Sequence, residues 1–452
     1  MERHSAPAFV ASSEMSTKNE IAGRVTASAI PVAPERGERA LARAARRLIP
    51  LLAALYFVSF LDRVNIGFAA LTMNADLGLS ASAFGLGAGI FFIGYTLFTV
   101  PANMMLQRLG ASRWLALISI VWGLVSASTA FVTTPFEFYA VRLILGVTEA
   151  GFLPGVILYL TYWFPKEMRG RIIGNFFVAV PLANVLGAPL SGWLLTQSAL
   201  GFRGWQVMFI VEALPAITLG IITLFWLTDR PSHAKWLNED EKRAIEAMVD
   251  DGADAAGHPA RLRDGLLNPV VWTLGMLYFL IVIGLYGFGF WSPQILQSLG
   301  NLSTEQTGWI VAIPNLVAAI GLLLWSRHSD RAGERIWHIA IPVLLSAAGF
   351  LVAGQATSLI VATLAFAVAT LGIYAACPVF WTLPSLVLRG SAAAAGIALV
   401  NSLGNLAGYA GPMTMGWLKD STGDYSYGLA VLAGSMMLAG LLALSLRKAI
   451  AH

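Results

Sequence analysis

The chain has 452 residues, of which 57% are hydrophobic and 12% are charged. A water-soluble globular domain carries about 25% charged residues, so the composition excludes that class and indicates a protein that crosses a membrane several times. One cysteine, Cys377, excludes a disulfide framework within the chain. The net charge of +4 is typical of a membrane protein with basic residues on its inner side, and we infer no nucleic-acid partner from it.

Residues 1–47 precede the first apolar run and lack the apolar core of a signal peptide, so we interpret them as an N-terminal tail on the cytoplasmic side. The end of this tail, residues 34–47, is basic and alanine-rich. Two structures fit that composition. One is a short helix lying on the anionic inner leaflet, and the other is a helical extension of the first membrane span.

Hydropathy predicts twelve membrane-spanning helices in two groups of six. The first group, within residues 48–227, has spans near 48–71, 83–106, 114–132, 136–162, 171–196 and 205–227. The second group, within residues 269–447, has spans near 269–298, 305–325, 336–354, 358–382, 391–417 and 425–446. Residues 228–268 form a cytoplasmic linker loop, in which Asn238 and Glu241 predict a capping box at the start of a short helix. Residues 448–452 are a short C-terminal tail.

Basic residues concentrate in one set of alternate loops, so both termini are predicted to be cytoplasmic. The expected location is the plasma membrane, which is the inner membrane if the source is bacterial. The two groups of spans also resemble each other: residues 162–171 (YWFPKEMRGR) and 380–391 (FWTLPSLVLRGS) both run from an aromatic residue and Trp through Pro to Arg-Gly. Such a duplication predicts a binding site at the midplane, between the halves.

Four charged residues fall inside apolar runs. Arg142 and Glu149 lie in the run 136–164, and Asp62 and Arg63 lie in the first span. Each charge costs at least ~2.5 kcal/mol at mid-membrane depth. At 1.5 Å per residue, Asp62 comes out level with Arg142 near the outer side, and Glu149 lies near the centre within reach of Arg63. We therefore expect an Asp62–Arg142 pair and a Glu149–Arg63 pair. A purely structural ion-pair cluster is the alternative, and it is disfavoured because buried pairs stabilise poorly relative to apolar packing.

Several motifs carry a family resemblance: LDRVNIGFA from Leu61, PANMMLQRLGASRW from Pro101, RLILGVTEAGFLPG from Arg142 and SDRAGER from Ser329. With these motifs the chain resembles the major facilitator superfamily and, within it, the anion:cation symporter family of tartrate-, phthalate- and hydroxyphenylacetate-type organic-anion transporters. The resemblance implies an all-α membrane protein with twelve transmembrane helices in two six-helix, pseudo-symmetric bundles.

The resemblance also implies function: proton-coupled uptake of a small organic carboxylate by alternating access. An organic anion that takes an arginine leaves a buried carboxylate that favours its protonated form, so we expect proton coupling at Asp62 and Glu149 and substrate binding at Arg63 and Arg142. The resemblance adds Tyr95 and Asn401 as substrate-binding residues. The SDRAGER motif implies a cytoplasmic gate at Asp330, Arg331 and Arg335. No cofactor or metal is expected, and the partners are the organic anion, the proton and the lipid bilayer, with the carrier acting as a monomer.

Substrate type is a further expectation. Sugar-acid carriers of this family have a polar amide in the fifth span, where this chain has FFVAVP at residues 176–181. This departure favours an aromatic or less hydroxylated carboxylate over a polyhydroxylated sugar acid. Trp291, Tyr374 and Trp381 are candidates to line the site, although aromatic residues in spans more often pack or anchor. Glu212, in the sixth span, is interpreted as an acid that pins helices together.

Competing functions stay open at this point. The nearest is an organic-anion exchanger or efflux antiporter of the same fold, and a transporter-like receptor is a more distant one. An intramembrane enzyme is disfavoured because the sequence offers no His, Cys or Ser constellation for catalysis.

Overall fold

The computed structural model describes residues 34–250, 267–388 and 391–447, and it is helical almost throughout. The first half of the chain forms α1 (Pro34–Leu77), α2 (Ala81–Leu109), α3 (Ala111–Ser128), α4 (Pro135–Glu149), α5 (Phe152–Trp163), α6 (Lys166–Phe177), α7 (Ala179–Leu194) and α8 (Gly204–Trp226). The linker carries α9 (Glu239–Asp250). Short 3-10 turns lie at Thr129–Phe131 and Pro231–His233.

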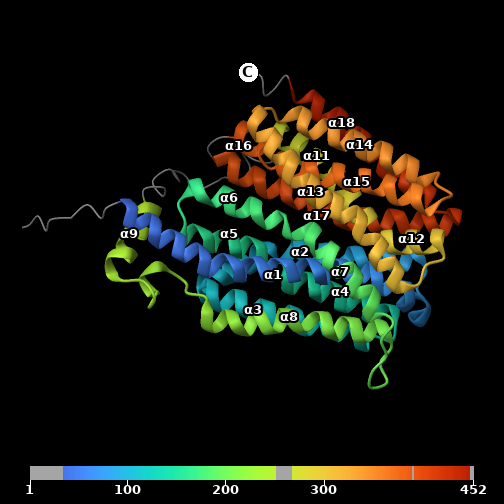
Figure 1. Ribbon diagram of the computed structural model, residues 1–452, viewed down its shortest axis with the longest axis horizontal. Helices are drawn as coiled ribbons and strands as arrows, with labels where there is room; N and C mark the ends of the chain where they lie inside the picture. Colours follow the sequence, from blue (N-terminus) through green and yellow to red (C-terminus); the bar gives the residue numbers. More distant parts are fainter. Residues whose placement is uncertain (1–33, 251–266, 389–390, 448–452) are drawn as a thin grey trace, which may run out of the picture.

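The second half forms α11 (Pro269–Gly289), α12 (Ser292–Gly300), α13 (Thr304–Ala332), α14 (Ile336–Gly354), α15 (Leu359–Phe380), α16 (Leu383–Val387), α17 (Ser391–Thr422) and α18 (Ser426–Ser445). In Figure 1 the helices α1 to α8 form the lower layer and α11 to α18 the upper one. Among the described residues, ten helical stretches are long and apolar enough to cross a membrane. The fifth and eleventh predicted spans correspond to α6 with α7 and to α17. The predicted all-α membrane fold class is confirmed.

Three predicted spans are each divided into two helices, and a fourth break separates the helix of the span 358–382 from the short helix α16; a proline follows every break. The divisions lie at residues 150–151, 178, 290–291 and 381–382, and they precede Pro154, Pro181, Pro293 and Pro384 by two to four residues. Proline has no amide hydrogen to donate to the carbonyl four residues earlier, and its ring clashes with that carbonyl. The interruptions therefore follow from the sequence, and those at residues 178 and 290–291 adjoin the cavities described below.

The first helix settles one of the alternatives left by the sequence. It begins at Pro34 and continues without interruption to Leu77, so the basic stretch is an extension of the first span. Residues 1–33 of the predicted tail, 251–266 of the predicted linker and 448–452 lie outside the described residues.

The linker helix α9 packs on this extension, with an ion pair between Arg43 and Glu241 at 3.1 Å. The predicted capping box is confirmed, because Asn238 Oδ1 accepts from Glu241 N at 2.8 Å and Glu241 Oε2 accepts from Asn238 N at 3.1 Å. We call the end of the molecule that carries α9 the inner end, and the opposite end the outer end.

The two halves meet closely at the outer end. The first turn of α2 is capped by Asp420 of α17, whose carboxylate accepts from Ala81 N at 3.0 Å and from Ser82 N at 2.7 Å. Trp291, at the start of α12, donates from Nε1 to the carbonyl of Pro412 at 3.1 Å. In Figure 1 these segments lie toward the right, near α12, while α9 and α16 mark the other end.

A second outer contact joins α7 and α13, which cross where both have glycine. A Cβ atom on Gly192 would lie 2.6 Å from the carbonyl oxygen of Thr304, and one on Gly308 would overlap the carbonyl oxygen of Ala188. Only glycine allows the two backbones to approach this closely. Together with the α2–α17 contact, this crossing seals the outer end of the space between the halves.

Candidate functional site

A cavity of about 110 Å³ lies between the two halves, on the inner side of the outer seal. It is lined from the first half by residues of α1, α2, α5 and α7, and from the second half by residues of α11, α13, α15 and α17. Its polar lining consists of Tyr56, Arg63, Tyr95, Tyr278, Tyr286, Tyr374, Cys377, Trp381, Asn401 and Asn405. The structure thus brings together three of the predicted substrate-binding residues, Arg63, Tyr95 and Asn401.

Arg63 forms a buried ion pair with Glu149. Its Nε donates to Glu149 Oε1 at 2.7 Å, and its Nη2 lies 2.5 Å from the same oxygen. Glu149 is the last residue of α4 and has no exposed surface. Its second oxygen, Oε2, is buried without a hydrogen-bond partner in the described part of the chain. The predicted pairing of these two residues is confirmed.

Aromatic rings surround the guanidinium of Arg63. Its Cζ lies 5.0 Å from the ring centroid of Phe60, 5.4 Å from that of Phe91 and 4.9 Å from that of Tyr95. These distances fall within the range of cation–π attraction. The rings flank the guanidinium at the cavity wall, where Arg63 is 8% exposed and lines the cavity.

The expected pair of Asp62 with Arg142 is wrong. Asp62 accepts hydrogen bonds from Trp122 Nε1 at 2.9 Å and from Ser126 Oγ at 3.0 Å, both on α3. These are neutral donors, and Asp62 is 1% exposed and does not line the cavity. Adjacent residues on a helix point about 100° apart, so Asp62 faces α3 while Arg63 faces the space between the halves.

Arg142 is held by backbone carbonyls. Its Nε donates to Gly87 O at 3.3 Å and its Nη2 to Ala88 O at 3.4 Å, while Nη1 is buried without a partner among the described residues. Its Cζ lies 5.1 Å from the Phe91 ring centroid. Arg142 is 1% exposed and absent from the cavity lining. In this state Arg142 therefore does not reach the cavity.

The predicted gate residues lie at the inner end, where α13 meets α14. Arg335 Nη1 donates to Asp330 Oδ1 at 2.8 Å and to Ser329 Oγ at 2.8 Å, while Arg331 is exposed. Glu334 also accepts from the first amides of α14, with 2.8 Å to Trp337 N. The motif thus joins two neighbouring helices of the same half.

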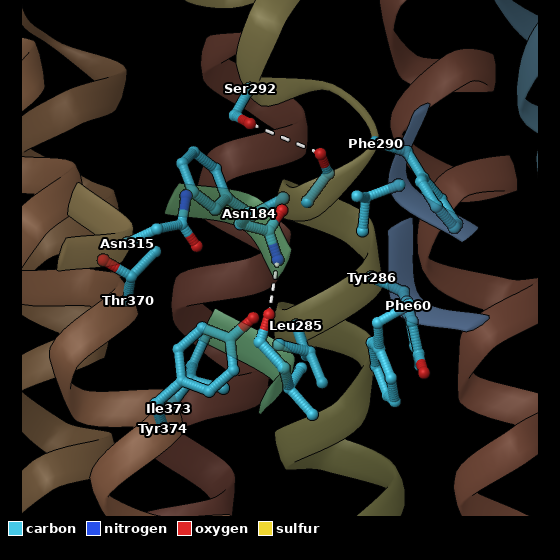
Figure 2. Close-up of a pocket in the computed structure, with 14 residues that line it drawn as sticks. Phe60, Asn184, Leu285, Tyr286, Phe290, Ser292, Asn315, Thr370, Ile373 and Tyr374 are labelled. Atoms are coloured by element: carbon cyan, nitrogen blue, oxygen red, sulfur yellow. Dashed lines mark hydrogen bonds between the residues drawn. The ribbon is translucent and has the colours of Figure 1, made fainter. Parts of the chain in front are cut away.

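A smaller cavity, about 30 Å³, lies beside the first one. It is lined by Tyr374 and by polar residues that the sequence analysis did not single out, among them Asn184, Asn315 and Thr370. Figure 2 shows it with Asn184 entering from α7 and with Asn315 and Thr370 on the opposite side. The two cavities share Phe60, Val180, Leu285, Tyr286 and Tyr374, so they adjoin. Polar amides inside apolar spans were the available sequence signal.

The three aromatic candidates fall into two places. Tyr374 and Trp381 line the large cavity. Trp291 is fully buried between Phe84 and Tyr425, with ring centroids at 5.1 and 5.7 Å, and it belongs to the outer seal. Glu212 is buried and accepts from Ser191 Oγ at 2.7 Å, which joins α8 to α7.

Comparisons with known proteins agree with this architecture. The family model described as Major Facilitator Superfamily matches residues 52–412. A relative from Agrobacterium vitis named "Putative tartrate transporter" is 47% identical over 412 residues, covering 91% of this chain and 95% of its own length. The Pseudomonas putida protein named "Putative metabolite transport protein NicT" is 43% identical over 407 residues, covering 88% of this chain and 92% of its own length.

A solved structure gives the same fold. It is described as "Partially occluded inward open conformation of the xylose transporter XylE from E. coli", and it aligns with a TM-score of 0.71 at 18% identity, covering 89% of this chain and 97% of the other. Two helical halves around a central polar cavity, sealed at one end, define a multi-pass membrane carrier, not an enzyme. The chain belongs to the Major Facilitator Superfamily and is a secondary transporter of that family.

Proposed function

We propose that this carrier takes up a small organic carboxylate together with a proton. The observation that carries the proposal is the Arg63–Glu149 pair at the wall of the central cavity. Arg63 is the one cation that lines this cavity among the described residues. A guanidinium binds a carboxylate through two parallel hydrogen bonds, which matches the shape of an organic acid.

An incoming carboxylate competes with Glu149 for the same guanidinium. Glu149 has no exposed surface, and a buried carboxylate that loses its cation is costly. A proton on Glu149 removes that cost, so proton binding and anion binding favour each other. Because this coupling is reciprocal, a protonated Glu149 in turn leaves Arg63 free for the substrate.

Alternating access completes the cycle. The outer seal at α2–α17 and α7–α13 corresponds to a state closed to the outside, and rocking of the halves about the cavity would exchange it for a state closed to the inside. Asp330 and Arg335 lie at the inner end and are proposed to act as part of the inner gate. The predicted location is the plasma membrane with both termini cytoplasmic.

The substrate class is proposed as a small carboxylic or dicarboxylic acid. The names of the relatives support an organic acid such as tartrate, and the aromatic rings around Arg63 also suit an aromatic acid. Asp62 is proposed as a second protonation site, since it is buried with neutral partners only. Tyr95 and Asn401 are proposed to hydrogen-bond the substrate from opposite halves.

The test is uptake of labelled tartrate and phthalate into proteoliposomes with an imposed pH gradient. We expect accumulation of at least one acid that stops when the proton gradient is collapsed. Accumulation that instead follows a sodium gradient would remove the proton from the proposal. Exchange of internal for external acid that responds to neither the proton gradient nor the sodium gradient would favour the alternative function, an organic-anion exchanger.

A further inference from the structure

The small cavity between α7, α11, α13 and α15 combines an apolar wall with several uncharged polar side chains. Its lining includes Asn184, Ser292, Asn315, Thr370 and Tyr374, and it contains no acidic or basic side chain among the described residues. Asn184 is 9%, Asn315 6% and Thr370 3% exposed. Side chains this polar are costly to bury inside a membrane unless they bind something.

The hydrogen bonds of these side chains fix which atoms remain available. Asn184 Nδ2 donates to Val180 O at 3.2 Å, and Asn315 Nδ2 donates to Val311 O at 2.9 Å. A backbone carbonyl can only accept, so the amide nitrogen must lie on that side and Oδ1 on the other. Neither Oδ1 atom accepts a hydrogen bond from the described part of the chain. Both Oδ1 atoms keep some surface that a water-sized molecule can reach.

The two hydroxyl groups are oriented in the same way. Thr370 Oγ1 donates to Phe366 O at 2.7 Å, and Ser292 Oγ donates to Gly289 O at 3.3 Å; Figure 2 shows the Ser292 and Asn184 bonds as dashed lines. Once its hydrogen is used, a hydroxyl group offers only lone pairs. Two amide oxygens and two hydroxyl oxygens are therefore free to accept, and Tyr286 and Tyr374 add phenols that can donate or accept.

This set of acceptors fits a hydrogen-bond donor. A carboxylate has no hydrogen to donate and would meet no cation here, so this cavity does not suit the charged end of the substrate. A hydroxyl group donates one hydrogen bond and is small enough for about 30 Å³, which is room for one or two water-sized groups. The adjoining large cavity has Arg63 for the carboxylate.

We infer that Asn184 and Asn315 form a hydroxyl-recognising subsite, which makes the carrier selective for hydroxylated carboxylates over their deoxy analogues. This inference rests on the proposed function, because it assigns Arg63 to the carboxylate. It also revises the substrate expectation drawn from residues 176–181, since the amide of Asn184 lies in the same span just after that segment.

The subsite also has a defined position relative to the outer seal. Asn184 lies one turn inside Ala188 on α7, and Asn315 lies two turns inside Gly308 on α13, whose backbones make the close crossing. Two hydroxyl groups of one ligand, one donating to each amide oxygen, would bridge the two halves directly beneath the seal. Binding would therefore favour the state closed to the outside.

The experiment is equilibrium binding of tartrate and succinate to the purified full-length protein in nanodiscs, without any transport step. The two acids share one carbon skeleton and differ by two hydroxyl groups. For the wild type we expect tartrate to bind about tenfold more tightly or better, because a site built for a hydroxyl group discriminates strongly against its absence. In Asn184→Leu and Asn315→Leu we expect tartrate affinity to fall about tenfold and succinate affinity to change less than about threefold.

Succinate binding in the same sample shows that each variant is folded. If a leucine variant loses binding of both ligands, Thr370→Val tests the subsite instead, because valine keeps the shape of threonine and removes its hydroxyl group. In this variant we expect a lower affinity for tartrate and an unchanged affinity for succinate. The matched control is Asn74→Leu, on α1 outside both cavities, with both affinities retained.

Equal wild-type affinities, or an equal loss of both ligands in Thr370→Val, would overturn the subsite while leaving carboxylate transport intact. A wild type that binds neither acid nor phthalate would instead overturn the proposed function and this subsite with it.

Discussion

Arg63 and Glu149, 86 residues apart in the chain, share a hydrogen bond of 2.7 Å between Nε and Oε1 that joins α1 to α4 at the wall of the central cavity. Only the arginine of this pair lines the cavity. A ligand can therefore contact the guanidinium of Arg63 directly. The carboxylate of Glu149 is affected only when the ligand displaces it from Arg63. This asymmetry gives the two residues separable roles, which substitutions can test.

Arg63→Lys should lose carboxylate binding although the charge is kept. A lysine ammonium is a point charge and cannot replace the planar fork that binds both oxygens, and losing one charge-assisted hydrogen bond costs about 1.5–3 kcal/mol. We expect the affinity to fall about tenfold to a hundredfold, measured by equilibrium binding. Arg327→Lys, exposed near the inner end of α13, is the control. Wild-type affinity in Arg63→Lys would place the carboxylate elsewhere.

Glu149→Gln should separate binding from coupling. The neutral amide resembles the protonated acid, so Arg63 stays free and substrate binding should survive with a weaker dependence on pH. Gradient-driven uptake should collapse, because no proton can be released inside. Counterflow of labelled for unlabelled substrate should persist, since that exchange never needs the empty carrier to return.

Both modes of transport are measured on the same proteoliposomes, with Glu305→Gln at the exposed outer end of α13 as the control. Equal loss of uptake and counterflow, in a protein that still binds substrate, would mean that Glu149 is needed for the conformational change itself.

Gly308→Ala should weaken the outer seal. The added Cβ would overlap the carbonyl oxygen of Ala188 on the facing helix, and overpacking typically costs about 1–3 kcal/mol. We expect a lower fraction of molecules closed at the outer end, measured by distances between spin labels on the outer ends of α7 and α13. The control is Gly434→Ala on α18, where nothing lies within 4 Å of the new Cβ and helix propensity predicts a gain of about 1 kcal/mol. An unchanged distance distribution in Gly308→Ala would contradict the prediction.

The cap that Asp420 makes on α2 should depend on external pH. Partial burial raises the pKa of Asp420, but hydrogen bonds from Ser82, Ser80 and the Ala81 backbone outweigh it and hold the pKa below its ordinary value of 3.8. A lowered pKa in the sealed state means that the cap stabilises this state above about pH 4 and is lost as the pH falls through the lowered pKa. An exposed anion at a helix N-terminus is worth about 0.3–1 kcal/mol before screening by salt.

We therefore expect the outer ends to separate more often as external pH falls below about 4, measured with spin labels on α2 and α17. Asp420→Asn should open the seal partly at neutral pH and remove the pH response in this range. A response that survives in Asp420→Asn would belong to another group.

The sequence alone indicated the membrane class and the all-α fold, and it predicted the positions of the spans and the depths of the charged residues, because hydropathy and the 1.5 Å rise per residue are local properties. It also predicted the capping box at Asn238, which depends on residues three apart. Depth was enough to pair Glu149 with Arg63. It was not enough for Asp62, whose partners lie on α3, because depth gives no direction around the helix axis.

The tertiary structure alone decided which faces of distant helices meet. The carbonyls of Gly87 and Ala88 hold Arg142 only because α2 packs on α4. Asn184 and Asn315 share a cavity only because the glycine crossing of α7 and α13 brings the two halves together just outside them. Neither contact leaves a periodic signal in the sequence, since each depends on the rotation and tilt at which helices from distant parts of the chain pack.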